Sequence, residues 1–145
     1  MTRLILFYVL LCTALIFSAS GSIADSWERT SQCPPQAIGR ADENPYKNVF
    51  TTKIKKWRRT AKYTFHGELF WDKSLRSTQG RIFLKKKGTT MNQRIADWSN
   101  PPETAVIEQD ITKYIDGKGT YFIEWKYMSG RSGVCIMRSE ITPSN

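Results

Sequence analysis

Basic side chains gather in two short stretches of the sequence, and one of them surrounds a tryptophan. Within seven residues, Trp57 is flanked by Lys53, Lys55, Lys56, Arg58 and Arg59. The second stretch is Lys85, Lys86 and Lys87. Clustered cations bind phosphate or sulfate, and an adjoining indole can stack on a base or on the apolar face of a sugar. The alternative is that these lysines flank hydrophobic strands and prevent edge-to-edge pairing.

The five tryptophans cannot all fill the core of so small a domain. Trp71 and Trp125 fall in alternating patterns and are expected in the core. Trp57 and Trp98 fall at the ends of predicted elements, so we expect them to be exposed and available for stacking. The predicted contact residues are therefore Lys53, Lys55, Lys56, Trp57, Arg58, Arg59 and Trp98.

Catalytic chemistry has few candidates, because His66 is the only histidine. A Ser-His-Asp or Cys-His arrangement would have to use it. A zinc site needs about four ligands, and no His and Cys cluster supplies them. Carboxylates for glycoside chemistry are present, but a sequence does not show the separation of an acid and a base. We predict no catalytic residue, metal or cofactor, and keep an enzyme that uses His66 as the alternative. The carboxylates are Glu68, Asp72, Asp97, Glu108, Asp110, Asp116 and Glu124.

Residues 1 to 24 have the pattern of a secretory signal peptide. Arg3 precedes an apolar run at residues 4 to 17, and small residues lead to Ala24. A membrane anchor is the alternative, but the run is shorter than the roughly 20 residues that a bilayer needs. We expect a secreted chain, extracellular or periplasmic, with no transmembrane segment after processing. Cys33 and Cys135 then remain, and one disulfide is their simplest use. Free thiols or an intermolecular bond are the alternatives.

The charge balance is basic. The whole chain has 22 Lys and Arg against 13 Asp and Glu, and removal of residues 1 to 24 takes away only Arg3, which leaves a formal charge of +8. Such a charge favours anionic partners: polysaccharide, nucleic acid, a phosphate-bearing surface or an acidic protein. A basic surface that only aids solubility is the alternative.

The elements that would position these residues are mainly strands. Residues 25 to 45 are predicted to be an irregular arm, and residues 46 to 59 fit a helix and a strand equally. Alternating or β-rich patterns follow at residues 62–71, 81–87, 105–109 and 120–128, with a weak strand or loop at 91–98. We expect about six strands and at most one helix near the N-terminus. Residues 46–145 would form one disulfide-closed β-sandwich or barrel.

The stretch from residue 110 to 136 is expected to organise this domain. Every second residue from Tyr121 to Tyr127 is aromatic or aliphatic, so one face of the strand is apolar. Phe122, Glu124 and Lys126 take the other face. Glycines precede and follow the strand, as turns with positive φ require.

The same stretch resembles the closing strands of jelly-roll carbohydrate-binding modules. The resemblance is carried by Asp110, Thr112, Tyr114, Gly117, Tyr121, Trp125, Tyr127, Gly130 and Gly133. It implies a jelly-roll sandwich that binds a carbohydrate.

A second resemblance is to secreted microbial ribonuclease-like proteins, including inactive effectors. Its features are an early cysteine, a possible helix, a sheet closed by a late cysteine, and YTFHGELF at residues 63 to 70. Active members use two histidines, whereas this chain has one, so this resemblance implies binding of RNA or a host protein. We therefore expect a non-catalytic binding domain for a carbohydrate or anionic surface, with the ribonuclease-like protein or effector as the alternative.

Overall fold

The computed structural model describes residues 33–44, 46–72, 77–131 and 133–144. All of these belong to one structural unit, Gln32–Asn145. The signal peptide predicted for residues 1 to 24, and Trp27, lie outside the described residues.

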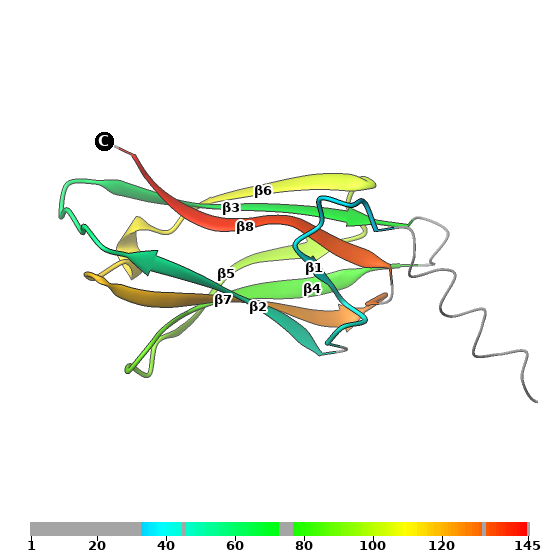
Figure 1. Ribbon diagram of the computed structural model, residues 1–145, viewed down its shortest axis with the longest axis horizontal. Helices are drawn as coiled ribbons and strands as arrows, with labels where there is room; N and C mark the ends of the chain where they lie inside the picture. The colour runs from blue at the N-terminus through cyan, green and yellow to red at the C-terminus, as the bar shows by residue number, and fades with distance from the viewer. Residues whose placement is uncertain (1–32, 45, 73–76, 132, 145) are drawn as a thin grey trace, which may run out of the picture. The chain divides into compact units, whose positions relative to one another are not determined.

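Eight strands form two four-stranded sheets in which every pairing is antiparallel (Figure 1). Sheet A has the order β1-β8-β3-β6, and sheet B has the order β2-β7-β4-β5. The predicted mainly β sandwich is confirmed, with two strands more than the six expected. The strands are β1 (Gly39–Arg40), β2 (Lys47–Ile54), β3 (Lys62–Trp71), β4 (Gln79–Lys86), β5 (Asn92–Ser99), β6 (Thr104–Asp110), β7 (Gly119–Ser129) and β8 (Val134–Ser144), and one 3-10 turn, η1 (Thr112–Tyr114), follows β6.

The core lies between the inner faces of the two sheets. In β3, Tyr63, Phe65, Gly67 and Leu69 are buried, while every second residue between them is half-buried. In β7, Trp125 is fully buried, and its ring meets that of Phe65 edge-on at a centroid distance of 6.1 Å. The alternation predicted for both strands is therefore confirmed, because the apolar face of each strand packs against the other sheet.

Residues 46 to 59, which fitted both a helix and a strand, contain β2. The strand pairs with β7 over its whole length, from Lys47 opposite Lys126 to Ile54 opposite Gly119. The structure has no α-helix in the described residues, so the helix implied by the ribonuclease-like resemblance is not found in this segment.

The N-terminal arm is tied to the end of the chain. Cys33 and Cys135 form the predicted disulfide, with a Cα–Cα distance of 5.8 Å. Beyond it, Gly39 and Arg40 pair with β8 as the short strand β1, so the arm expected to be irregular includes one strand. Residues 91–98, expected as a weak strand or loop, contain β5.

The expectation that Trp98 is exposed is wrong. Its side chain is 4% exposed, and its ring lies 5.6 Å from that of Trp125. Trp98 stands opposite Gly80 of β4, and a Cβ added there would lie 2.0 Å from the indole. Thr78 accepts a hydrogen bond from the indole nitrogen at 3.1 Å. The ring therefore fills the space that the missing side chain of Gly80 leaves in the core.

Candidate anion-binding site

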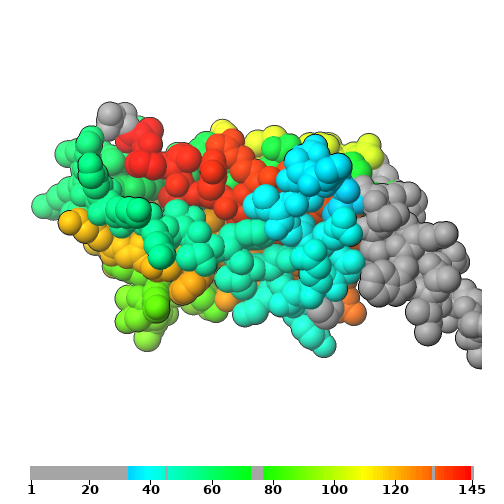
Figure 2. Space-filling view, in the orientation of Figure 1, coloured from blue at the N-terminus to red at the C-terminus, as the bar shows by residue number. Residues whose placement is uncertain are grey.

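The basic stretch around Trp57 lies where the two sheets meet along one side. β2 is an edge strand of sheet B, and β1 pairs with β8 only at Cys135 and Ile136. In Figures 1 and 2 the later part of β8 runs beside β2 and the segment that follows it.

Two adjoining hollows of about 320 and 350 Å³ open in this region, and they share Lys56, Tyr63 and Pro143. We call them together the basic groove. Its lining residues are Thr52, Lys53, Ile54, Lys55, Lys56, Arg58, Ala61, Tyr63, Ile141 and Pro143.

The floor of the basic groove is apolar and fixed in place. Tyr63 is 1% exposed, and its hydroxyl oxygen accepts a hydrogen bond from the backbone N–H of Arg58 at 3.1 Å. Ile54 and Ile141 are also buried. The segment after β2 is therefore held over the core while its cationic side chains point to solvent.

The rim of the basic groove is cationic. Lys53, Lys55, Lys56 and Arg58 are all exposed, and the lining residues include no aspartate or glutamate. An anion in the groove would meet several cationic side chains. Four of the predicted contact residues are therefore brought together along the basic groove.

Trp57 and Arg59 do not line this groove. Trp57 is half-buried, and its indole nitrogen donates to the carbonyl of Ile115 at 3.1 Å. The ring thus anchors the segment to the core. Arg59, which follows Arg58 in the sequence, is exposed. Trp98 lies in the core, so it is not part of the site.

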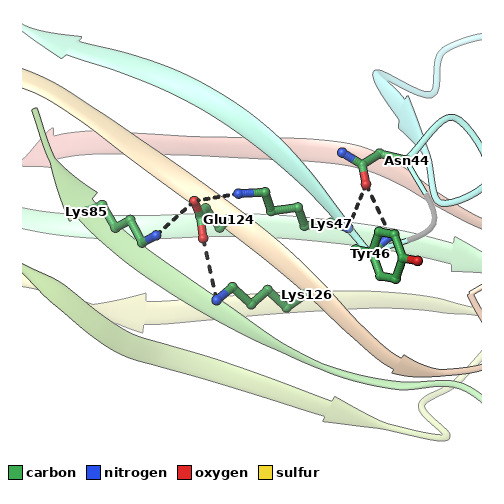
Figure 3. A network of polar contacts seen from close by, with 6 residues as sticks. All are labelled: Asn44, Tyr46, Lys47, Lys85, Glu124 and Lys126. Carbon is green, nitrogen blue, oxygen red and sulfur yellow. Dashed lines mark hydrogen bonds and ion pairs between the residues drawn. The ribbon is translucent and has the colours of Figure 1, made fainter.

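A second cationic cluster surrounds Glu124 on the outer face of sheet B, and the sequence reasoning did not identify it (Figure 3). The ammonium groups of Lys47 and Lys85 lie 3.3 and 3.1 Å from the same oxygen, Oε1. The ammonium of Lys126 lies 3.8 Å from Oε2, which is buried and has no hydrogen-bond partner among the described residues.

The Glu124 side chain is 7% exposed although it points away from the core. Burial raises the pKa of this carboxyl, but hydrogen bonds from Lys85 and Lys47 outweigh burial and hold the pKa below its ordinary value. The carboxylate is therefore ionised at neutral pH, and it gathers three ammonium groups around it. The sequence contained one indication of this cluster: Glu124 and Lys126 are two residues apart, so they share a face of the strand.

Two further polar clusters join neighbouring strands. His66 lies 3.0 Å from Glu108 through Nδ1 and 2.7 Å from Thr142 Oγ1 through Nε2, which links β3 to β6 and β8. This order of carboxylate, imidazole and hydroxyl is that of a catalytic triad. These residues line neither hollow of the basic groove, and the contacts account for His66 as a cross-strand link.

The other cluster fixes the turn that precedes β7. Lys86 donates to Asp116 at 2.6 Å, and the Tyr121 hydroxyl lies 3.1 Å from the same carboxylate oxygen. The hydrogen bond from Lys86 holds the pKa of Asp116 below its ordinary value. Gly119, with φ of +152°, passes close to the Lys86 side chain, where a Cβ would lie 3.1 Å from Cε. Lys86 is therefore held by an ion pair within the domain.

In the part of the chain that the structure describes, no three His, Cys, Asp or Glu side chains are grouped so that they could hold a metal ion. None of the helical segments in these residues has the length and hydropathy to cross a membrane.

Comparison with known proteins supports the fold alone. No protein-family model and no curated protein sequence matches the chain. A solved structure with a similar fold is that of a recombinantly expressed latent aurone synthase (polyphenol oxidase) co-crystallized with hexatungstotellurate(VI). The match has a TM-score of 0.50 and 10% sequence identity, and it covers 74% of this chain and 27% of that chain.

Proposed function

We propose that this protein is a secreted, non-catalytic binding domain that recognises an acidic polysaccharide through the basic groove. The observation that carries the proposal is the groove itself, because four cationic side chains line its two adjoining hollows and the lining residues include no aspartate or glutamate. The predicted signal peptide and the Cys33–Cys135 disulfide support an oxidising compartment outside the cytoplasm.

The state of Trp57 and Trp98 favours recognition by charge over recognition by stacking on a tryptophan. Proteins that bind single-stranded nucleic acid stack successive bases on exposed aromatic rings. Trp98 is buried, and Trp57 is half-buried with its N–H bonded to the backbone. What the groove offers instead is ammonium and guanidinium groups above an apolar floor, which suits sulfate or carboxylate groups on a sugar chain.

Binding to a heparin tetrasaccharide tests the proposal. The double variant Lys55→Glu and Lys56→Glu reverses two exposed charges of the groove. The matched control, Lys87→Glu and Lys118→Glu, reverses two exposed charges outside the lining residues. We expect the groove variant to lose at least about tenfold in affinity, which corresponds to about 1.4 kcal/mol, and the control to change by less than about threefold.

Equal losses in the groove variant and the control would refute the groove as the site. Tight binding of an RNA oligonucleotide without tetrasaccharide binding would favour the ribonuclease-like alternative. A tight protein partner without affinity for either ligand would favour an effector.

A further inference from the structure

The outer face of sheet B carries a row of cationic side chains. In the register of the sheet, Lys47 of β2 stands opposite Lys126 of β7, which in turn stands opposite Arg81 of β4. The row ends at Asp97 of β5. Like charges directly opposite one another destabilise a sheet. The row therefore concentrates positive charge on one face at a cost in stability, and ion pairing of Lys47 and Lys126 with Glu124 offsets part of that cost.

Glu124 organises part of this row. It lies one step along the same face, between Val49 and Phe83 in the register, and its carboxylate draws in Lys47, Lys85 and Lys126 (Figure 3). One negative charge faces three positive charges, so the cluster keeps a net charge of +2. It remains cationic although Glu124 is ionised.

The three ammonium groups keep donors for a ligand. Each ammonium has three N–H donors, and each of these contacts with Glu124 is to a single oxygen. The side chains of Lys47, Lys85 and Lys126 are 42%, 33% and 42% exposed. The buried carboxylate of Glu124 holds the three ammonium groups in place, and the side chains that carry them are partly exposed to solvent. Such fixed cations are preorganised for binding an anion.

The cluster and the basic groove are connected through β2. Lys53 lines the groove, and it points to the same outer face as Lys47, because Phe50 and Thr52 pair with the buried Ile123 and Tyr121. The two lysines are six positions apart on the strand, which is about 20 Å. Along the strand direction Lys85 of β4 is level with Thr51, because both stand opposite Phe122 of β7. Cations therefore occur on the outer face of sheet B from the groove to the Glu124 cluster.

We propose that Lys47, Lys85 and Lys126 form a second anion subsite, and that the ligand is a long sulfated polysaccharide that occupies the groove and this subsite together. Glu124 is the positioning residue of the subsite. The inference rests on the proposed function and names its ligand as an extended chain, since a small anion would need only one of the two places.

Comparison of a heparin tetrasaccharide with a heparin dodecasaccharide tests the inference. The wild-type protein should bind the longer chain at least about tenfold more tightly, because one chain engages both subsites. The variant Lys47→Gln with Lys126→Gln keeps Lys85 as a partner for Glu124. It should bind the tetrasaccharide with the affinity of the wild type and lose most of the additional affinity for the dodecasaccharide. Lys87→Gln with Lys118→Gln is the matched control and should keep the gain.

A second measurement on the wild-type protein does not depend on the folding of a variant. Acetylation of lysine amines, read by mass spectrometry, should show Lys47 and Lys126 protected by the dodecasaccharide and unprotected by the tetrasaccharide. Lys55 and Lys56 should be protected by both.

The second subsite would be overturned if the control also lost the higher affinity for the dodecasaccharide, or if the dodecasaccharide did not protect Lys47 and Lys126 from acetylation. Neither result would bear on the groove as a site. Loss of tetrasaccharide binding in the groove variant alone would support the proposed function independently. If single-stranded RNA protected these lysines at lower concentration than the dodecasaccharide, the choice of a sulfated polysaccharide would be wrong.

Discussion

Replacement of Glu124 by glutamine should destabilise the domain and make its stability less dependent on acid pH. The change keeps the shape of the side chain and removes the charge that holds the ammonium groups of Lys47 and Lys85. It leaves three cations close together with no carboxylate between them.

The size of the effect follows from the two hydrogen bonds. A hydrogen bond to a charged group contributes about 1.5–3 kcal/mol when it is well protected from water. The lysine side chains are 42% and 33% exposed, so water screens both contacts and hydrates the ammonium groups once the charge is lost. We expect a loss of about 1–2 kcal/mol in the free energy of unfolding at pH 7, after this discount.

The sign of the pH dependence is fixed by the pKa of Glu124. Its value in the folded protein lies below the ordinary 4.5 despite burial, because Lys85 and Lys47 donate hydrogen bonds to it. The carboxylate therefore stabilises the fold fully at pH values above 4.5. This stabilisation is lost as the pH falls through the native pKa.

Urea unfolding of the wild type and Glu124→Gln, followed by tryptophan fluorescence, measures the difference at each pH. The difference should be present at pH 7 and should shrink steadily on acidification. Glu68→Gln makes the same chemical change on a half-buried residue of β3 and should alter stability by less than about 0.5 kcal/mol. A difference that stays constant from neutral to strongly acid pH, or that is absent at pH 7, would refute the assigned role of the charge.

Two other changes should destabilise the fold for different reasons. Gly80→Ala would place a Cβ 2.0 Å from the Trp98 ring, so we expect a loss of about 1–3 kcal/mol in urea unfolding; Gly117→Ala, whose nearest atom is 3.6 Å away, is the control, and an equal effect of both would contradict the packing argument. The double variant Cys33→Ser and Cys135→Ser removes a disulfide that joins residues with a sequence separation of 102, and its free energy of unfolding should fall by about 4–5 kcal/mol. A difference below about 1 kcal/mol from the oxidised wild type would show that the disulfide does little to restrict the unfolded chain.

Local alternation was enough to predict the strands that fill the core. Residues 62–71 and 120–128 alternate over their whole length, and β3 and β7 follow this pattern. Residues 46 to 59 could not be decided, because Phe50 and Ile54, four residues apart, lie on one face of a helix and also on one face of a strand. The pairing with β7, a distant segment, selects the strand.

The candidate site was predicted as far as it is continuous in sequence. Lys53, Lys55, Lys56 and Arg58 are neighbours, so their cluster was visible from the sequence. The groove is completed by Ile141 and Pro143 of β8, which come near only through the tertiary fold.

Residues whose environment depends on strand register were missed. The alternation of β7 placed Glu124 on the outer face, but its burial depends on Lys47 and Lys85 from the neighbouring strands. In the same way, Trp98 is buried because Gly80 stands opposite it. A single sequence carries no signal for either register.

The strand order has a consequence for the way in which the chain folds. The last two strands both lie inside their sheets: β8 lies between β1 and β3, and β7 lies between β2 and β4. Before they join, β3 can pair with β6 and β4 with β5, whereas β1 and β2 have no partner among the described strands. Pairing of segments that are distant in sequence slows folding, because loop-closure entropy is lost before the contacts compensate for it. The two sheets are therefore completed late, and until then the chain exposes strand edges that can aggregate.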